Sequence, residues 1–414
     1  MLRDIHPKVQ LTLAKYAVFR ILSDAGFATP FFVVFMIGNG VTFTDIAIGT
    51  SVMAVAMITL ELPSGYLADR VGRKRTLFLS QLCLGAGAIG YVFASSTIDV
   101  VLLYLAFGVG AALRSGAGTA WFYDTLKEYG EEQNYTAIAG QIGSYVKYIE
   151  AATMIGGGFL FLVEPMYAIA VGGIANLLAA VVVITFPQNK DFSDDDSTIS
   201  PVEAGRIAKD FVTDSSVRVV LLVSVLGLGA MYTASKYIQP AAFNAVPEGG
   251  YDVSGLVIPA AILVSATYAI FQFGSGFAMR TSDFFQTRLG ISGTMTVAYG
   301  GSAVCMIVPF FVPTLTLPAV ILLMSLPMLA EPAVNGYLND QTTSVARATV
   351  MSVASFLNAL LRIPIMLGTG VIADIISAEF AMGVVGILFL IISTSLLFGD
   401  QIYTYSRSIS STGN

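Results

Sequence analysis

The sequence predicts an all-α integral membrane protein whose chain crosses the bilayer twelve times. Three observations lead to this prediction: 55% of the residues are hydrophobic, the mean hydropathy is +0.77, and long apolar runs recur along the chain. A soluble protein of 414 residues needs more polar surface than 12% of charged residues can supply. Lipid, in contrast, solvates an apolar exterior, so the composition favours a membrane protein.

The apolar runs are long enough to cross a membrane, since a helix needs about 20 residues for one crossing. Six runs precede a polar break and six follow it. Pro309, Pro313 and Pro318 predict a turn between the ninth and the tenth run. We expect transmembrane helices at 11–36, 46–66, 76–96, 100–123, 138–163, 167–186, 217–243, 254–278, 290–312, 315–337, 349–373 and 380–398.

The positive charges predict the orientation of these helices. With the N-terminus placed in the cytoplasm, the six external loops contain no Lys or Arg, whereas the cytoplasmic loops contain clusters such as Arg70 to Arg75. Positive residues favour the cytoplasmic side during insertion. We therefore expect a multi-pass protein of the plasma membrane with both termini in the cytoplasm.

The polar break predicts how the chain is divided. Residues 187–216 are acidic and rich in Ser and Asp, as in the stretch DFSDDDSTIS, and are typical of a linker. They separate an N-terminal six-helix half, 1–186, from a C-terminal six-helix half, 217–399. Residues 400–414 then form a cytoplasmic tail.

The composition argues against several classes of function. The net charge of −6 and the pI near 4.9 disfavour nucleic acid as a partner, because phosphate would be repelled. The single His6, and Cys83 and Cys305 inside apolar runs, do not suit a metal site, a disulfide framework or a catalytic triad. We expect no enzymatic activity and no cofactor. The expected partners are a small-molecule substrate, protons and the lipid bilayer, and the chain is expected to act as a monomer.

The stretch GYLADRVGRKRT, Gly65 to Thr76, concentrates charge between the second and the third apolar run. Positive-inside charge explains its basic residues but not its acid or its glycines. The stretch resembles the signature of the major facilitator superfamily, which has the form G-x-L-A-D-R-x-G-R-K in this same loop. The residues that match are Gly65, Leu67, Ala68, Asp69, Arg70, Gly72, Arg73 and Lys74.

The resemblance implies a fold of two six-helix halves and a latch on the cytoplasmic side. Asp69 would face the start of span 11 near RATVMS, where a helix N-terminus favours negative charge. Arg73 would pair with Asp124 at the cytoplasmic end of span 4. The predicted latch consists of Gly65, Asp69, Arg70, Gly72, Arg73 and Asp124.

Charged residues inside spans are functional candidates, because charge in the bilayer interior is costly. Arg20 and Asp24 are four apart on span 1, and Lys147 and Glu150 are three apart on span 5, so each pair shares a helical face. Each pair is open to two interpretations: the two charges neutralise each other, or the acid is a protonation site.

Arg114 on span 4 has a more specific setting. Gly110 and Gly118 lie one turn either side of it and predict open space around its guanidinium group. The stretch RSGAGTA partly resembles the span-4 signature of the family, which the family associates with proton coupling, although the usual glutamine is absent.

The second half has a polar set of its own. Glu331 and Asn335 share a stripe on span 10, whose helix Pro327 and Pro332 should interrupt. The resemblance implies that spans 1, 4, 7 and 10 line a central cavity. Any of the polar residues could instead be an interhelical tether. The predicted substrate and proton cavity comprises Arg20, Asp24, Arg114, Lys147, Glu150, Tyr232, Lys236, Glu331, Asn335 and Arg362.

Three functions remain open from the sequence. The leading prediction is a secondary active transporter that works by alternating access and exports amphiphilic compounds by proton antiport. The stretch MIGGGFL, from Met154, weakens antiport, because it lacks the proline of the family's antiporter signature. The alternative is uptake or exchange of a small anionic metabolite, favoured by four basic residues within spans. The third is a transporter-like membrane sensor that moves nothing.

Overall fold

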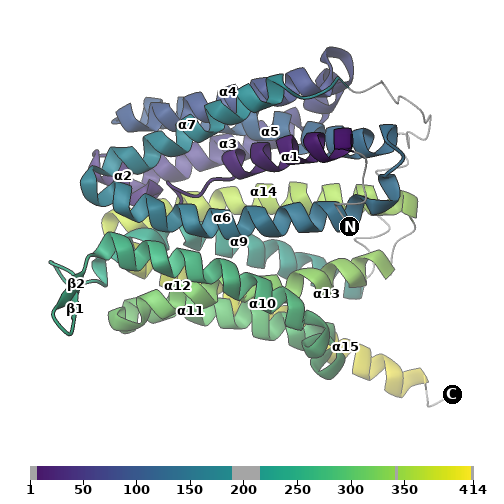
Figure 1. Ribbon diagram of the computed structural model, residues 1–414. Helices are drawn as coiled ribbons and strands as arrows, with labels where there is room; N and C mark the ends of the chain where they lie inside the picture. Colours follow the sequence, from purple (N-terminus) through teal and green to yellow (C-terminus); the bar gives the residue numbers. More distant parts are fainter. Residues whose placement is uncertain (1–6, 189–214, 341–343, 412–414) are drawn as a thin grey trace. The chain divides into compact units, whose positions relative to one another are not determined.

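The computed structural model describes residues 7–188, 215–340 and 344–411, and these residues are almost entirely helical (Figure 1). They belong to two compact units. The first is Met1–Asp194 together with Gly249–Ala269, and the second is Asp195–Glu248 together with Ile270–Asn414. The boundary between Asp194 and Asp195 falls within the predicted linker, 187–216. The predicted domain boundaries themselves stay predictions.

The first unit contains the helices of the predicted N-terminal half. They are α1 (Pro7–Ser23), α2 (Phe32–Gly38), α3 (Phe43–Val71), α4 (Arg73–Gly90), η2 (Tyr91–Phe93), α5 (Thr97–Glu128), η3 (Glu132–Asn134), α6 (Tyr135–Val163) and α7 (Pro165–Ile184). Local chemistry sets several of their starts. Thr42 and Ser96 form capping boxes with Asp45 and Asp99, which satisfy free N–H groups at the starts of α3 and α5.

The second unit contains the remaining helices, apart from the first ten residues of α10. They are α9 (Ser215–Asn244), α10 (Ala260–Met295), η4 (Thr296–Gly300), α11 (Gly301–Phe311), η5 (Pro313–Leu315), α12 (Thr316–Ser325), α13 (Pro327–Asp340), α14 (Ser344–Ile375) and α15 (Ala378–Ser411). Gly290 interrupts α10 with a φ of 68°, a left-handed conformation that glycine adopts readily. The turn at η5 confirms the predicted break between the ninth and the tenth run.

The lengths of the helices agree with a multi-pass membrane fold. Among the described residues, ten segments are long and apolar enough to span a bilayer. One of them, Ala260–Phe311, has 52 residues and is long enough for two crossings. The first predicted span is not among the ten, because it is divided into α1 with 17 residues and α2 with 7. The segments are therefore consistent with the predicted twelve crossings.

The prediction of one uninterrupted helix over 11–36 is wrong. The helix ends at Ser23, residues 24–31 form a turn segment, and α2 begins at Phe32. Pro30 has no N–H and disfavours helical geometry at the residue before it, so it prevents a continuous helix. Gly26 allows this segment to approach α6 closely, because a Cβ atom there would lie 2.8 Å from Cγ of Met154. We call residues 24–31 the helix break.

The predicted start of a helix at 254 is also wrong. Residues 251–258 form a two-stranded antiparallel hairpin, β1 (Tyr251–Val253) and β2 (Leu256–Ile258), and α10 starts at Ala260. The two turn residues, Ser254 and Gly255, have φ angles of 56° and 87°, as required by a tight two-residue hairpin turn. Leu256 and Val257 in the second strand resemble the start of an apolar span, which explains the error.

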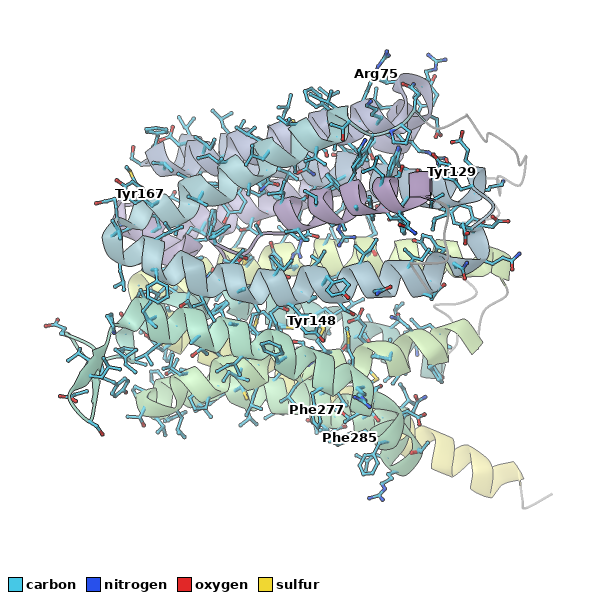
Figure 2. All side chains as sticks on the ribbon, viewed as in Figure 1. Arg75, Tyr129, Tyr148, Tyr167, Phe277 and Phe285 are labelled. Carbon is cyan, nitrogen blue, oxygen red and sulfur yellow. The ribbon has the colours of Figure 1, made fainter. Side chains whose placement is uncertain are left out.

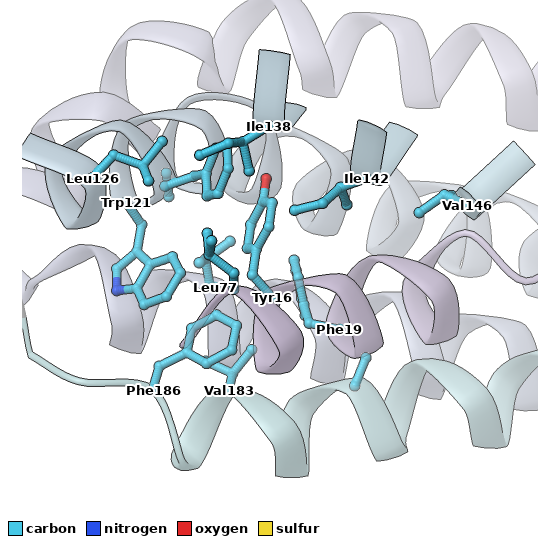
Figure 3. Close-up of a cluster of buried hydrophobic side chains, with 14 of the residues drawn as sticks. Tyr16, Phe19, Leu77, Trp121, Leu126, Ile138, Ile142, Val146, Val183 and Phe186 are labelled. Atoms are coloured by element: carbon cyan, nitrogen blue, oxygen red, sulfur yellow. The ribbon is translucent and has the colours of Figure 1, made fainter. Parts of the chain in front are cut away.

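A hydrophobic cluster joins several helices of the first unit. Figure 3 shows Tyr16 and Phe19 of α1 close to Trp121 of α5 and Phe186 after α7. The Trp121 and Phe186 rings are stacked with centroids 4.1 Å apart. Fixing α1 and α5 together in this way determines which polar groups further along the two helices can meet.

Candidate functional site

The side chains of Arg20, Asp24 and Arg114 form one charged cluster in the first unit. Nε and Nη2 of Arg20 lie 2.9 Å from Oδ2 of Asp24. Nη1 of Arg114 lies 2.8 Å from Oδ1 of the same carboxylate. The spacing of Arg20 and Asp24 predicted a shared helical face, the two side chains form an ion pair, and Arg114 binds the same carboxylate. One carboxylate against two guanidinium groups leaves the cluster with a net charge of +1.

Ser23 also contributes to this cluster. Nη1 of Arg114 donates to its Oγ at 2.6 Å, so both hydrogens of this nitrogen are used by neighbouring residues of α1 and the helix break. Ser23 was not among the predicted residues. Its position directly before Asp24, on a span that contains a charge, is the only sequence signal that could have indicated it.

The helix break lies against α6. The backbone N–H of Gly26 donates to Oγ1 of Thr153 at 2.9 Å, and this hydroxyl donates to the carbonyl oxygen of Glu150 at 2.8 Å. A side chain thus satisfies one N–H group that the interrupted helix leaves without a helical partner. Thr153, too, was missed, although it lies one turn from a charged residue. The contact places the helix break beside Glu150.

The surroundings of Arg114 differ from those predicted. Gly110 and Gly118 do not open space around the guanidinium group, because α4 packs against both of them. A Cβ at Gly110 would lie 2.8 Å from Cγ of Leu84, and one at Gly118 would lie 3.6 Å from Cδ2 of Leu77. Glycine at 110 allows close approach of the two helices, whereas the contact at 118 is an ordinary one. The side chain of Arg114 extends toward α1 and is 37% exposed.

Lys147 and Glu150 on α6 form a further ion pair of this unit. Their Nζ and Oε2 atoms are 2.7 Å apart. The two partners differ in environment: the side chain of Lys147 is 60% exposed and that of Glu150 is 15% exposed. The base can therefore leave the pair for solvent more easily than the acid can.

In the second unit, two cations meet one aromatic ring. Arg362 of α14 places its guanidinium carbon 4.1 Å from the ring centroid of Tyr232 of α9, and Nζ of Lys236 lies 5.2 Å from the same centroid. Aromatic faces attract cations through their quadrupole. Asn358, one turn before Arg362, donates to the carbonyl oxygen of Val225 at 2.9 Å and holds α14 against α9.

Glu331 and Asn335 form the polar stripe of α13. Glu331 is exposed and Asn335 is partly exposed. The predicted interruption at Pro327 is confirmed, because α12 ends at Ser325 and α13 begins at this proline. The interruption predicted at Pro332 is wrong, since this residue lies inside α13. Membrane helices tolerate an internal proline when other groups satisfy the freed carbonyl.

The loop between α3 and α4 has the contacts within the first unit that the signature implies. Arg73 forms an ion pair with Asp124, and its Nη1 donates to the carbonyl oxygen of Ala120 at 3.0 Å. Gly72 has a φ of 95°, so the turn between the two helices requires glycine. Figure 2 shows Arg75, at the start of α4, at the same end of this unit as Tyr129, which follows α5.

The other residues of the predicted latch have fewer described contacts. Asp69 and Arg70 are exposed, and Arg70 stacks on the ring of Tyr66 at 4.7 Å. No atom lies within 4 Å of a Cβ added at Gly65, so packing does not explain this glycine. The predicted partner of Asp69, at 347–352, lies outside the residues whose side chains the structure describes. The role of the latch stays a prediction.

Three donors hold the chain where the predicted linker begins. Lys15 of α1 donates to the carbonyl oxygen of Thr185 at 2.9 Å, and Lys74 of the signature loop donates to that of Phe186 at 2.7 Å. Nε1 of Trp121 donates to the carbonyl oxygen of Pro187 at 3.3 Å. Cations and N–H donors are favourable at the C-terminus of a helix such as α7. Lys74 thus connects the signature loop to the chain after α7.

Replacing Asp124 by asparagine is expected to reduce transport at least about tenfold while insertion and expression stay near normal, because it removes the charged partner of Arg73 and no apolar packing. Asp69→Asn is expected to have the same effect if the loop works as one latch. Glu128→Gln, at an exposed acid at the end of α5, is the matched control. Transport by purified protein in proteoliposomes measures the effect, and normal rates for Asp69→Asn would remove that residue from the latch.

Comparison with known proteins identifies the fold. The chain superposes on the nucleoside transporter NupG with a TM-score of 0.75 at 15% identity, covering 94% of this chain and 98% of that one. It superposes on a POT family transporter in complex with 5-aminolevulinic acid with a TM-score of 0.66 at 12% identity, covering 96% and 98%. A bacterial homolog of the human lysosomal transporter Spinster gives 0.68 at 14% identity, covering 94% and 95%. At these identities the likeness shows the fold alone.

Sequence comparison identifies the family. An uncharacterized MFS-type transporter of Methanocaldococcus jannaschii is 23% identical over 126 residues. The matched segment is 30% of this chain and spans 31% of the length of the archaeal protein. The family model of the Major Facilitator Superfamily matches residues 17–364, which is most of the chain. The chain therefore belongs to the Major Facilitator Superfamily and is a multi-pass membrane protein.

Proposed function

We propose that this chain is a secondary active transporter that moves a small organic anion by alternating access. The observation that supports this proposal best is the cluster of Arg20, Asp24 and Arg114, in which one carboxylate faces two guanidinium groups. A net positive charge within a membrane-spanning region is costly unless an anion accompanies it. A negatively charged substrate supplies that anion.

The two arginines of the cluster are partly accessible. The side chains of Arg20 and Arg114 are 39% and 37% exposed, whereas that of Asp24 is 19% exposed. The shared acid is thus the innermost group, and the two bases lie around it with part of their surface free. The second unit has a cationic group of its own, Lys236 and Arg362 around Tyr232.

The structural neighbours do not select the substrate. They include a nucleoside transporter and a POT family transporter in complex with 5-aminolevulinic acid, and nucleosides and 5-aminolevulinic acid differ chemically. Function on a shared fold depends on the site and not on the fold. The charge of the cluster is therefore the better guide.

Proton-coupled export of amphiphilic compounds is the second candidate. The pair of Lys147 and Glu150 favours it, because an acid inside a span is a functional candidate and its basic partner is largely exposed. Tyr145 and Tyr148 on the same helix are exposed and offer aromatic contacts for an amphiphile.

One experiment separates these functions. Proteoliposomes would be incubated with a defined mixture of carboxylates, neutral metabolites and cationic amphiphiles, with and without a pH gradient, and the retained compounds identified by mass spectrometry. We expect retention of carboxylates above that of protein-free liposomes. Retention of amphiphiles that depends on the gradient would favour the second candidate. A correctly inserted protein that retains nothing would contradict both and favour a sensor.

We further propose a plasma membrane location with cytoplasmic termini. In a protein whose native cysteines are replaced, Glu248→Cys is expected to react with an impermeant maleimide added to intact cells, because it lies in a loop without basic residues. Ser197→Cys, in the predicted linker, should react only after permeabilisation. Labelling of Ser197→Cys in intact cells would reverse the orientation.

A further inference from the structure

We propose that Arg114 binds a carboxylate of the transported molecule through its Nε and Nη2 atoms, and that Ser23 is the positioning residue that holds the guanidinium group in this orientation. The inference rests on the proposed function. It adds the chemical group of the substrate that is recognised and the atoms that recognise it.

The hydrogen bonds of Arg114 leave one edge of its guanidinium group free. Its Nη1 carries two hydrogens, and the structure shows two acceptors for them, Oγ of Ser23 at 2.6 Å and Oδ1 of Asp24 at 2.8 Å. Within the described part of the chain, Nε and Nη2 have no hydrogen-bond acceptor. These two nitrogens form a planar fork that matches the two oxygens of a carboxylate.

Arg20 cannot take this role in the same arrangement. Its Nε and Nη2 both face Oδ2 of Asp24 at 2.9 Å, so the corresponding edge of its guanidinium group is occupied. Arg20 therefore neutralises Asp24, whereas Nε and Nη2 of Arg114 remain available for a substrate. The two arginines differ in function although both bind the same carboxylate.

The region around the fork is accessible. The side chain of Arg114 is 37% exposed. The adjacent residue of α5, Ser115, is also exposed and is polar.

Ser23 holds the guanidinium group at the point where α1 ends. It is the last residue of α1 and is buried. Its Oγ accepts one hydrogen bond from Nη1 of Arg114, and Oδ1 of Asp24 accepts the other. These two acceptors fix the plane of the guanidinium group. Without Ser23 the group could rotate toward Asp24 and turn its fork away.

The charge of the cluster selects a singly charged group. A carboxylate bound to the fork brings the net charge from +1 to zero, whereas a phosphate monoester, with a charge of about −1.5 to −2, would leave an excess of negative charge. A neutral cluster is less costly in a low-dielectric environment than a charged one. A bound carboxylate therefore lowers the electrostatic cost of the conformational change that moves access from one side of the membrane to the other. The empty, charged site raises that cost.

The fork is tested with Arg114→Lys, which keeps the positive charge and removes the planar pair of donors. Proteoliposomes are incubated with a mixture of small carboxylates, phosphate monoesters and neutral metabolites. We expect the wild-type protein to retain carboxylates. The uptake rate of the variant should be at least about tenfold lower than that of the wild type. Arg280→Lys, at an exposed arginine of α10, is the control and should transport normally.

The outcomes separate this inference from the proposed function. If carboxylates are retained and Arg114→Lys moves them at the wild-type rate, the fork is wrong and anion transport stands. If phosphate monoesters are retained in place of carboxylates, the assigned group is wrong. If no anion is retained, the proposed function fails and the inference fails with it.

Ser23 is tested by its effect on the two kinetic constants. Ser23→Ala is expected to raise KM for the retained carboxylate about tenfold with kcat within about twofold, because it disturbs the orientation of the binding group. Ser23→Thr, which keeps the hydroxyl, should restore KM. Ser144→Ala, where the hydroxyl donates only to its own helix at Gly140, is the matched control. Equal KM values for Ser23→Ala and wild type, or failure of Ser23→Thr to restore KM, would exclude the positioning role.

Discussion

Replacing Asp24 by asparagine is expected to abolish transport and to lower the melting temperature of the purified protein by several degrees. The substitution raises the net charge of the cluster from +1 to +2 and leaves Arg20 and Arg114 facing each other without an acid between them. Removing the shared acid leaves two like charges close together, which is unfavourable even where the side chains are partly exposed. The effect is measured by thermal unfolding in detergent and by uptake into proteoliposomes.

The double variant Arg20→Gln, Asp24→Asn shows what Asp24 does. It restores the net charge of +1, with Arg114 still able to donate to the side-chain oxygen at position 24. If Asp24 only neutralises the arginines, both stability and transport driven by a pH gradient should return. If Asp24 is a protonation site, stability should return and gradient-driven transport should not. Recovery of neither would show that the charge balance of the cluster is not what the protein requires.

The sequence was sufficient to predict features that depend on local spacing. The apolar runs predicted the helices because each run must be long enough to span the hydrocarbon core. The ion pair of Arg73 with Asp124, which joins distant segments, was implied only by the resemblance of the loop to the family signature, and the structure shows it. Four-residue spacing predicted the pair of Arg20 with Asp24, because both residues extend from the same helical face.

The sequence was insufficient where a feature depends on contacts between distant segments. The bond from Arg114 to Ser23 joins residues 91 positions apart, and no local pattern relates them. Gly26 and Pro30 both disfavour helix, yet they lie within an apolar run whose hydropathy predicts one crossing. The hairpin at 251–258 was missed for a similar reason, because apolar strand residues directly precede α10. The first of these features depends on a tertiary contact, whereas the helix break and the hairpin depend on turn residues within stretches that are apolar overall.

The contact between the helix break and α6 leads to the last prediction. Gly157→Ala is expected to destabilise the protein and to reduce transport strongly. A Cβ at Gly157 would collide with the backbone carbonyl of Phe27 in the helix break. That backbone cannot move freely, since the neighbouring Gly26 is hydrogen-bonded to Thr153. Overpacking of this kind typically costs about 1–3 kcal/mol. Displacement of the helix break also moves Asp24 away from Arg114.

The adjacent glycine provides a matched control. A Cβ at Gly156 would lie 3.4 Å from the ring of Phe27, which is an ordinary van der Waals contact with a side chain. Both substitutions replace glycine by alanine on α6 and gain the same helix propensity, about 1 kcal/mol in an exposed helix. The difference between them therefore isolates the collision with the backbone. We expect Gly156→Ala to melt at or above the wild-type temperature and Gly157→Ala to melt several degrees below it. Equal melting temperatures would show that the helix break does not pack on α6 as closely as the structure shows.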